Sequence, residues 1–245
     1  MKQKKFSHVS NYTDYMEIIF KLVISRNEKQ KILDMPAGNG KLAEKLREYH
    51  HKVICADINN EKKDYVFVDM EKLLPFNDNE FDTVICMEGI EHILNPVQLI
   101  SELSRICKKK GRIIISLPNI QNLYSRYQFL CTGTFYQFSP VAYTKTHKHK
   151  NIDKGHITSL SYIQLHYLFK YFGAHLISIK GDKYKRKILI PLLIPFIAMG
   201  YLWTKFSKGK KQTKNSTELN QIQSNLFAPP VLLSRSLILV FEKTY

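Results

Sequence analysis

Three ionisable side chains stand close together in the stretch EGIEH, residues 88–92. In a helical turn the positions i, i+3 and i+4 share one face, so Glu88, Glu91 and His92 can converge on one point. Carboxylates and imidazoles move protons, and an imidazole does so close to neutral pH. A further histidine, His156, lies in KGHIT, residues 154–158.

A second chemical signal is the glycine turn in ILDMPAGNGKLAEKL, residues 32–46. Gly38-x-Gly40-x-x-Ala43 fits the dinucleotide fingerprint, but Asp34 would then lie near a pyrophosphate at the helix N-terminus, which is unfavourable. Glycines let a ligand approach the backbone because they lack Cβ. The stretch therefore favours a cationic ligand. S-adenosylmethionine, with a sulfonium, an ammonium and no phosphate, fits.

Composition places these motifs in an ordinary globular chain of 245 residues, which we expect to form a single domain, residues 1–245, with insertions. The four cysteines fall singly, which suits reduced thiols, and residues 1–16 lack the apolar core of a secretory signal, so we expect a cytoplasmic protein. The net charge of +16 predicts attraction to nucleic acid or to an acidic membrane surface.

Strand and helix signals alternate along the chain at the spacing of βαβ units. Asn95 followed by Pro96 is an N-cap with proline at the first helical position, and Gly173 closes a later helix. We predict helices over residues 11–27, 40–49, 96–109 and 161–171, and strands over residues 31–35, 52–56, 65–68, 82–87, 112–117, 174–180 and 236–242. This alternation predicts an open, doubly wound α/β sheet that binds ligands at the carboxyl ends of its strands.

Over roughly residues 30–180 and the last strand, the sequence resembles the class I S-adenosylmethionine-dependent methyltransferases, and is most similar to the MetW-like and ubiquinone-type O-methyltransferases. Their acidic-x-Gly-x-Gly-x-Gly motif stands here as DMPAGNG, residues 34–40, in which Pro36 replaces the first glycine. LPFNDNEFDTVIC, residues 74–86, matches their approach to the fourth strand. The resemblance implies a Rossmann-like seven-stranded sheet, here with an apolar insertion before the last strand.

The same resemblance implies which residues hold S-adenosylmethionine. Asp57 matches the acidic residue that accepts hydrogen bonds from both ribose hydroxyls, and Asp69 matches the residue near the adenine amino group. The expected cofactor-binding residues are Asp34, Pro36, Gly38, Gly40, Asp57, Ile58, Asp69, Met70 and Met87.

A Glu-x-x-Glu-His stretch also occurs in ubiquinone-type O-methyltransferases and in small-RNA 2'-O-methyltransferases, where with a later histidine it binds a divalent cation. The resemblance therefore implies Glu88, Glu91, His92 and His156 as ligands of Mg²⁺, Mn²⁺ or Fe²⁺. In the alternative, Glu91 caps a turn and His92 packs under the sheet, and no metal is bound. The expected catalytic residues are His156, His92 and Glu91, with His156 or His92 as general base in a metal-free scheme.

Three segments lie outside this core: an N-terminal helical extension, residues 1–29, a substrate lid, residues 118–160, and an insertion, residues 184–230. In the lid, aromatic and basic side chains either line an acceptor pocket or belong to the core and the solvated surface; they are Tyr124, Arg126, Tyr127 and Tyr136. The insertion holds the uncharged run ILIPLLIPFIAMGYLWT, residues 188–204, with basic residues on both sides.

At about 17 residues, with two prolines, this run is short for a membrane-spanning helix. Its aromatic end and flanking lysines suit a segment lying in the headgroup region of an anionic leaflet; the alternatives are a buried helix and a dimer contact. Residues 208–223 are polar, and we predict a flexible loop there.

Together these features predict an O-methyltransferase acting on a lipid-linked or saccharide hydroxyl, of surface-glycan, glycolipid or quinone type, as a peripheral protein at the cytoplasmic membrane face. A second hypothesis is an RNA 2'-O-methyltransferase, favoured by the basic charge. A third is a non-catalytic membrane-bound adaptor that keeps the fold as a scaffold.

Overall fold

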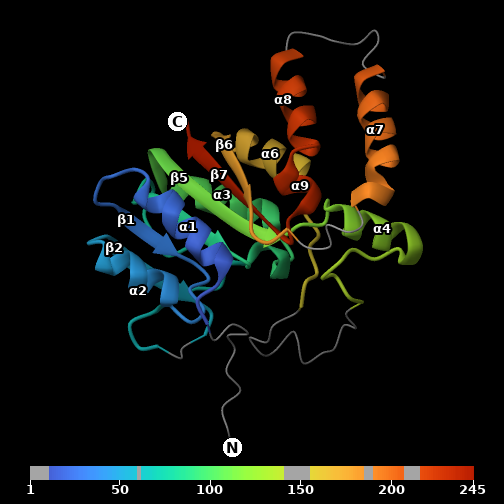
Figure 1. The fold of residues 1–245 in the computed structure, drawn as a ribbon. Coiled ribbons are helices and arrows are strands. Elements are labelled where there is room, and N and C mark those ends of the chain that lie inside the picture. The colour runs from blue at the N-terminus through green and yellow to red at the C-terminus, as the bar shows by residue number, and fades with distance from the viewer. Residues whose placement is uncertain (1–10, 60–61, 141–154, 185–189, 207–215) are drawn as a thin grey trace, which may run out of the picture.

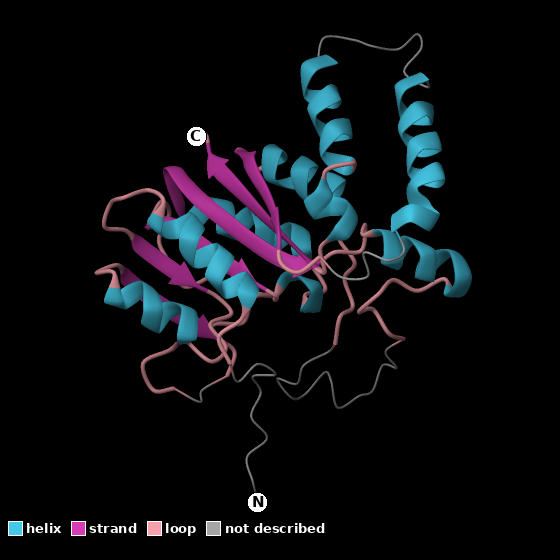
Figure 2. Cartoon of the chain, viewed as in Figure 1, coloured by secondary structure: helices cyan, strands magenta, loops and turns pink. Residues whose placement is uncertain are grey.

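The chain forms a seven-stranded sheet covered by helices on both faces (Figures 1 and 2). The computed structural model describes residues 11–59, 62–140, 155–184, 190–206 and 216–245. The strands are β1 (Lys31–Asp34), β2 (Lys52–Asp57), β3 (Val66–Phe67), β4 (Phe81–Met87), β5 (Cys107–Pro118), β6 (Ala174–Gly181) and β7 (Ser236–Lys243). Their order is β3-β2-β1-β4-β5-β7-β6, and β7 runs antiparallel to both of its neighbours.

The helices come in two groups, those that cover the sheet and those that extend beyond it. The described helices are α1 (Asp14–Ile24), α2 (Lys41–Glu48), the 3₁₀ helix η1 (Ile90–His92), α3 (Pro96–Ile106), α4 (Leu123–Thr132), α6 (Tyr162–Tyr171), α7 (Ile190–Phe206), α8 (Ser216–Leu226) and α9 (Pro229–Leu233). Side chains of α1 and α2 pack on one face of the sheet, and those of α3 and α6 pack on the other.

The two apolar cores follow from the period of two in the strands. In β5, Ile113 and Ile115 join the core under α3 and α6, while Ile114 joins the core under α1 and α2. All three side chains are fully buried. A strand covered by helices on both faces therefore has a continuous run of apolar residues. This is why the sequence predicts such a strand well.

The expected N-cap of α3 is confirmed, and so is the expected glycine after α6, since Gly173 follows the last turn with φ 80°. The Asn95 side chain accepts a hydrogen bond from the backbone N–H of Gln98, and Pro96 occupies the first turn. Ser161 and Gln164 form a reciprocal capping box at the start of α6. These local bonds satisfy N–H groups that a helix leaves without partners, so they fix both N-termini from sequence alone.

Several predicted boundaries are wrong. The leading helix, expected over residues 11–27, spans Asp14–Ile24, and the fifth strand, expected over residues 112–117, spans Cys107–Pro118. The helix expected to reach residue 109 ends at Ile106, because Cys107 is extended (φ −76°, ψ 137°) and pairs with Phe81 at the start of β4. The third strand, expected over residues 65–68, is reduced to Val66–Phe67. It lies at the edge of the sheet and pairs with β2 alone, so few hydrogen bonds extend it.

The flexible loop predicted over residues 208–223 is wrong for its described part, because α8 begins at residue 216. This polar helix is held by tertiary contacts. Glu218 accepts a hydrogen bond from Lys170 at 2.5 Å, and its other oxygen lies 3.2 Å from His166 Nε2. Ile222 and Leu226 pack against the core. The helices α4 and α9 were also not anticipated.

The apolar run of the insertion forms α7, which stands beside α8 at one end of the molecule (Figure 1). Pro195 lies inside this helix. Among the described residues, none of the helices combines the length and the apolar character needed to cross a bilayer. All four cysteines are free thiols, as expected, with Cys131 exposed and the other three buried.

Candidate functional site

The glycine turn begins where β1 ends and stops where α2 begins. Gly38 and Gly40 have φ values of 53° and 74°, in the left-handed region that glycine adopts without strain. Gly40 is the N-cap of α2. Pro36 follows a cis peptide bond, and the N–H of Ala37 donates to Ala56 at the end of β2. The turn is thus fixed between two neighbouring strand ends.

Asp34 lies under this turn, fully buried at the end of β1. Neither carboxylate oxygen has a hydrogen-bond partner among the described residues. Burial, followed by the negative charge of Asp57, raises the pKa of Asp34 from 3.8 to about 7. A buried carboxylate without a partner is costly, and a cation or a hydrogen-bond donor would relieve that cost. The site therefore fits a positively charged ligand.

Asp57 ties the turn to the end of β2. Its Oδ2 accepts a hydrogen bond from the N–H of Gly38 at 2.8 Å, and its Oδ1 accepts one from the N–H of Asn59 at 3.1 Å. The side chain is nearly buried. Hydrogen bonds to an ionised acceptor are stronger than neutral ones, so Asp57 holds both loops in position.

Two further side chains, not found by the sequence analysis, cover the turn from outside. Lys62 donates to the carbonyl of Asn39 at 2.9 Å and pairs with Glu44 at 3.0 Å. Tyr65 donates to the carbonyl of Gly38 at 3.3 Å. They precede the short strand β3, and no motif marks them, because their contact with the turn depends on how β3 pairs with β2.

The other expected cofactor residues lie at the same edge of the sheet, at the ends of β2, β3 and β4. Ile58 is partly exposed after β2, and Met87 is buried at the end of β4. Asp69 accepts a hydrogen bond from the N–H of Glu71 at 3.0 Å. Met70 packs against the apolar core. The expected set therefore gathers at the carboxyl ends of parallel strands.

Gly89 brings the turn and the acidic stretch together. A Cβ built on Gly89 would lie 2.6 and 2.9 Å from two ring carbons of Pro36, and 3.2 Å from the terminal methyl of Met70. The chain leaving β4 therefore passes directly against the turn. Only a residue without a side chain fits there unless Pro36 moves.

Beyond this contact, Glu91, His92 and His156 form a compact group. Their ligand atoms all lie within 4.8 Å of one another, and the two imidazole rings are 4.9 Å apart between centroids. Glu91 is fully buried, and both histidines are partly exposed. The carbonyl of Glu91 accepts hydrogen bonds from the N–H groups of Ile157 and Thr158, which fixes the loop of His156 against η1.

Backbone carbonyls define the tautomer of both rings. His92 Nδ1 lies 2.9 Å from the carbonyl oxygen of Gly155, and His156 Nδ1 lies 2.8 Å from that of Gln137. A carbonyl oxygen only accepts, so each Nδ1 carries a hydrogen, and Nε2 is the basic nitrogen of each neutral ring. The same arrangement orients histidines that bind metals. The ring of Phe138 packs 5.4 Å from that of His156.

Glu88 does not join this group, so the expected convergence of Glu88 with Glu91 and His92 on one face is wrong. Glu88 has φ 48°, and η1 begins only at Ile90, so the three residues do not share a regular helix. The Ser116 hydroxyl donates to Glu88 at 2.5 Å. Burial raises the pKa of Glu88, while this hydrogen bond and the charge of Arg235 lower it.

Tyr15 of α1 is a buried phenol. Burial is the largest cause that raises its pKa, and the charges of Glu88 and Glu91 raise it further, while Thr13 and Arg235 lower it. The sequence shows Tyr15 only as part of an apolar helical face.

The expected lid residues are in part structural. Tyr124 and Tyr136 make an edge-to-face contact with centroids 5.3 Å apart. Arg126 donates to the carbonyl of Gln121 at 2.6 Å and is exposed. Tyr127 is exposed. His147 and His149, in the basic loop of the lid, lie outside the described residues.

Comparisons with known proteins agree with this geometry. Residues 33–115, from the end of β1 into β5, match the family model described as Methyltransferase domain. A ubiquinone biosynthesis O-methyltransferase of Photobacterium profundum is 30% identical over 135 residues, which are 49% of this chain and 56% of that protein. A demethylmenaquinone methyltransferase of Paenarthrobacter aurescens is 28% identical over 113 residues, 40% of this chain and 45% of that protein. The chain thus matches about half the length of these relatives.

A solved structure extends the likeness to the whole fold. The crystal structure of a SAM-dependent methyltransferase from Archaeoglobus fulgidus aligns with a TM-score of 0.55 and 19% identity, covering 93% of this chain and 94% of that one. At this identity the match establishes the fold. Together with the strand order 3-2-1-4-5-7-6, it shows that the chain has the fold of the class I S-adenosylmethionine-dependent methyltransferases, and residues 33–115 of this fold match a methyltransferase domain.

Proposed function

We propose that the protein transfers a methyl group from S-adenosylmethionine to a hydroxyl oxygen of a lipid-linked or saccharide acceptor, of surface-glycan, glycolipid or quinone type. The observation that carries the proposal is the buried carboxylate of Asp34, which lacks a partner among the described residues and lies under a glycine turn. A ligand with a sulfonium and an ammonium supplies the positive charge that such a carboxylate attracts.

In this proposal the sheet edge described above holds the cofactor. Asp57 accepts hydrogen bonds from the ribose hydroxyls, and Asp69 lies near the adenine amino group. Gly38 and Gly40 let the backbone approach the amino acid part, with Pro36 fixing the turn. Ile58, Met70 and Met87 provide apolar contacts to the adenosine. Bound there, S-adenosylmethionine supplies an electrophilic methyl group on its sulfonium.

The chain itself must position the acceptor and remove its proton. Positioning supplies much of the catalysis in a displacement between two bound molecules. His156 and His92 each present a basic Nε2, because Nδ1 of each ring bonds to a carbonyl. In the proposed scheme His156 takes the proton of the acceptor hydroxyl, and Glu91 and His92 orient the ring of His156.

In a second scheme, the group of Glu91, His92 and His156 binds a divalent cation, Mg²⁺ or Mn²⁺. Glu91, His92 and His156 supply one carboxylate and two imidazoles within 4.8 Å, a donor set that suits Mn²⁺ or Fe²⁺ better than Mg²⁺. The cation would lower the pKa of an acceptor hydroxyl. Glu88, whose carboxylate bonds to Ser116, would join only after moving.

The acceptor class rests on two observations. The similar proteins named above are a ubiquinone biosynthesis O-methyltransferase and a demethylmenaquinone methyltransferase, so quinone-type acceptors are the first candidates. The exposed apolar helix α7 suits an acceptor attached to a lipid. The net charge of +16 favours RNA as the alternative acceptor, with transfer to a 2'-hydroxyl.

The test is to incubate the protein with methyl-labelled S-adenosylmethionine and a membrane-containing cell extract, and then to separate lipids and glycolipids from RNA. We expect label in the lipid fraction, and none with an Asp57→Ala variant. Label in RNA would overturn the acceptor class. If S-adenosylmethionine does not bind in calorimetry, the enzymatic proposal fails and the scaffold hypothesis replaces it.

A further inference from the structure

The apolar helix α7 buries none of its side chains, and its most exposed large apolar residues form one stripe along the helix. At about 100° per residue, positions i, i+4, i+7, i+11 and i+14 fall on one line along a helix. The five most exposed apolar residues of α7 occupy this line, with 62 to 77% of each side chain exposed: Leu192, Phe196, Met199, Trp203 and Phe206. We call them the α7 stripe.

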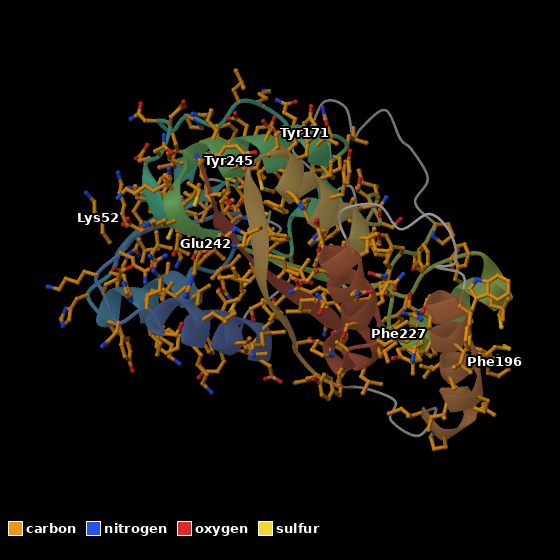
Figure 3. The ribbon with its side chains drawn as sticks, turned by 90° about the horizontal axis from the view of Figure 1, so that it is seen from above. Lys52, Tyr171, Phe196, Phe227, Glu242 and Tyr245 are labelled. Atoms are coloured by element: carbon orange, nitrogen blue, oxygen red, sulfur yellow. The ribbon has the colours of Figure 1, made fainter. Side chains whose placement is uncertain are left out.

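The opposite side of α7 is about half exposed and makes a ring contact with the rest of the protein. Tyr201, half a turn away from the α7 stripe, packs its ring edge-to-face with Phe227, which follows α8, at 5.3 Å between centroids. Figure 3 shows Phe227 on the inner side of α7 and Phe196 at the outer edge of the molecule. The α7 stripe is therefore turned away from the domain.

A stripe of this size calls for a covering partner, because monomeric proteins seldom expose contiguous large apolar patches. Charge indicates which partner. From residue 183 to residue 217 every charged residue is basic: Lys183, Lys185, Arg186 and Lys187 before α7, and Lys205, Lys208, Lys210, Lys211 and Lys214 at its end and after it. Positive charge at both ends of an apolar helix complements the anionic headgroups of a lipid surface.

Length and charge also define how the helix would lie. With 17 residues, α7 is about 25 Å long, shorter than the roughly 30 Å of a bilayer core. Lysines at both ends are stable only in the headgroup region, so neither end can enter the core first. The helix would lie along the surface with its stripe among the acyl chains and Trp203 near the headgroups.

We propose that the α7 stripe docks the protein onto the surface of an anionic phospholipid bilayer. This inference deepens the proposed function, on which it rests for the lipid-linked acceptor, since it names the surface from which that acceptor is taken. Figure 1 shows α4 beside the end of α7 that is nearer the sheet, and α4 is the helix that follows β5 in the lid. Leu130 and Tyr127 of α4 are also exposed and would extend the apolar contact.

A second copy of the chain is the competing occupant, and charge argues against it. Both ends of α7 are basic, so pairing two copies along their stripes would bring like charges together in either the parallel or the antiparallel arrangement. Residues 183–217 of the sequence contain no acidic residue, although Lys183 pairs with Asp14 of α1 at 3.0 Å, so the charge that would repel a second copy comes from the other basic residues.

The single tryptophan, Trp203, gives a direct test with the full chain. Vesicles of phosphatidylcholine with phosphatidylglycerol should shift its fluorescence to shorter wavelength and protect it from acrylamide. Pure phosphatidylcholine vesicles should bind at least about tenfold more weakly, because the attraction to the basic ends is lost. An unchanged emission in both, or equal binding to both, overturns the proposal. A blue shift that grows with protein concentration alone assigns the stripe to a second copy.

Flotation with the same vesicles tests the residues. Replacing Leu192 and Phe196 by serine should weaken flotation by about 100-fold, because two large apolar side chains no longer leave water. The control replaces Tyr167 and Tyr171 of α6 by serine, since both are exposed to a similar extent on another surface. This control should float like the unmodified protein. An equal loss of flotation in both variants would contradict docking through the α7 stripe.

Failure of this inference is distinguishable from failure of the proposed function. The stripe variant should bind S-adenosylmethionine in calorimetry with unchanged affinity, because α7 lies apart from the glycine turn. Vesicle binding without S-adenosylmethionine binding would reject the enzymatic proposal and keep the docking surface. S-adenosylmethionine binding and RNA binding without vesicle binding would reject the docking surface alone.

Discussion

The imidazole rings of His92 and His156 lie 4.9 Å apart, inclined at 75°, although α3, β5 and α4 separate them along the chain. The buried Glu91 anchors this pair, because its carbonyl accepts hydrogen bonds from two backbone N–H groups next to His156. The position of His156 as a proton acceptor therefore depends on these bonds, which hold its loop against η1.

Replacing His156 by alanine should lower the rate of methyl transfer by about 100-fold or more, because positioned acid–base groups contribute that much. Binding of S-adenosylmethionine should not change, since His156 lies outside the glycine turn. The matched control is His175→Ala, which removes an exposed histidine of β6 whose ring bonds to Thr244, just after β7. An equal loss in the control would remove His156 from the reaction.

Chelation separates the two schemes for this group. If a cation acts there, a chelator should abolish turnover, and Mn²⁺ should restore it in the unmodified protein but not in His92→Ala. If the histidine base acts alone, turnover should not respond to the chelator. The pH profile should then fall below the pKa of an imidazole, because the base must be neutral.

The variant Asp57→Ala should bind S-adenosylmethionine roughly 100-fold more weakly in calorimetry. It loses the acceptor for ribose and also the hydrogen bonds from Gly38 and Asn59, each worth about 1.5 to 3 kcal/mol for a charged acceptor. The control Asp64→Ala removes an exposed carboxylate 3.9 Å from Arg47. Unchanged affinity in Asp57→Ala would contradict the assignment of Asp57 to the cofactor.

Asp34 predicts an unusual pH dependence of stability. Its pKa of about 7 in the folded protein lies above the ordinary 3.8, so the folded state binds more protons than the unfolded chain between those values. The free energy of unfolding of the cofactor-free protein should therefore fall as pH rises from about 4 to about 7, by about 2 to 4 kcal/mol from this group.

Urea unfolding at pH 5 and pH 8 measures this effect. The variant Asp34→Asn has no ionisable group there, so its stability should change less between the two pH values than that of the unmodified protein. The affinity for S-adenosylmethionine should show the opposite trend in the unmodified protein and rise with pH through about 7, because the ionised carboxylate attracts the cation. If the unfolding free energies of both proteins changed equally with pH, a raised pKa of Asp34 would be contradicted.

Gly40 and Gly133 form a matched pair for testing the turn. Both have φ near 70°, so alanine at either should cost about 1 kcal/mol in backbone strain. At Gly40 the new Cβ would also meet the hydroxyl of Tyr65 and, at 2.7 Å, Lys62 Nζ, whereas nothing lies within 4 Å at Gly133. Gly40→Ala should lose more thermal stability and, unlike Gly133→Ala, weaken cofactor binding. Equal effects would contradict a crowded turn.

Much of the sheet was predictable because its strands are buried on both faces and their apolar runs are nearly continuous. The end of α3 was not, because Cys107 pairs with Phe81 of β4, and that pairing joins residues distant in sequence. For the same reason α8 appeared as a polar loop: its helix depends on Lys170 and His166 of α6. Long-range partners overrode local composition in both places.

Local apolar patterning and residue types at fixed spacing were enough to predict the α/β sheet, the glycine turn and the acidic residues at three strand ends. The family resemblance grouped Glu88 with Glu91, His92 and His156, but in the folded chain Glu88 bonds to Ser116 and stays outside that group. The exposure of the α7 stripe was likewise visible only in the folded chain. Such relationships depend on how separate segments pack against each other, which no periodicity along one segment encodes.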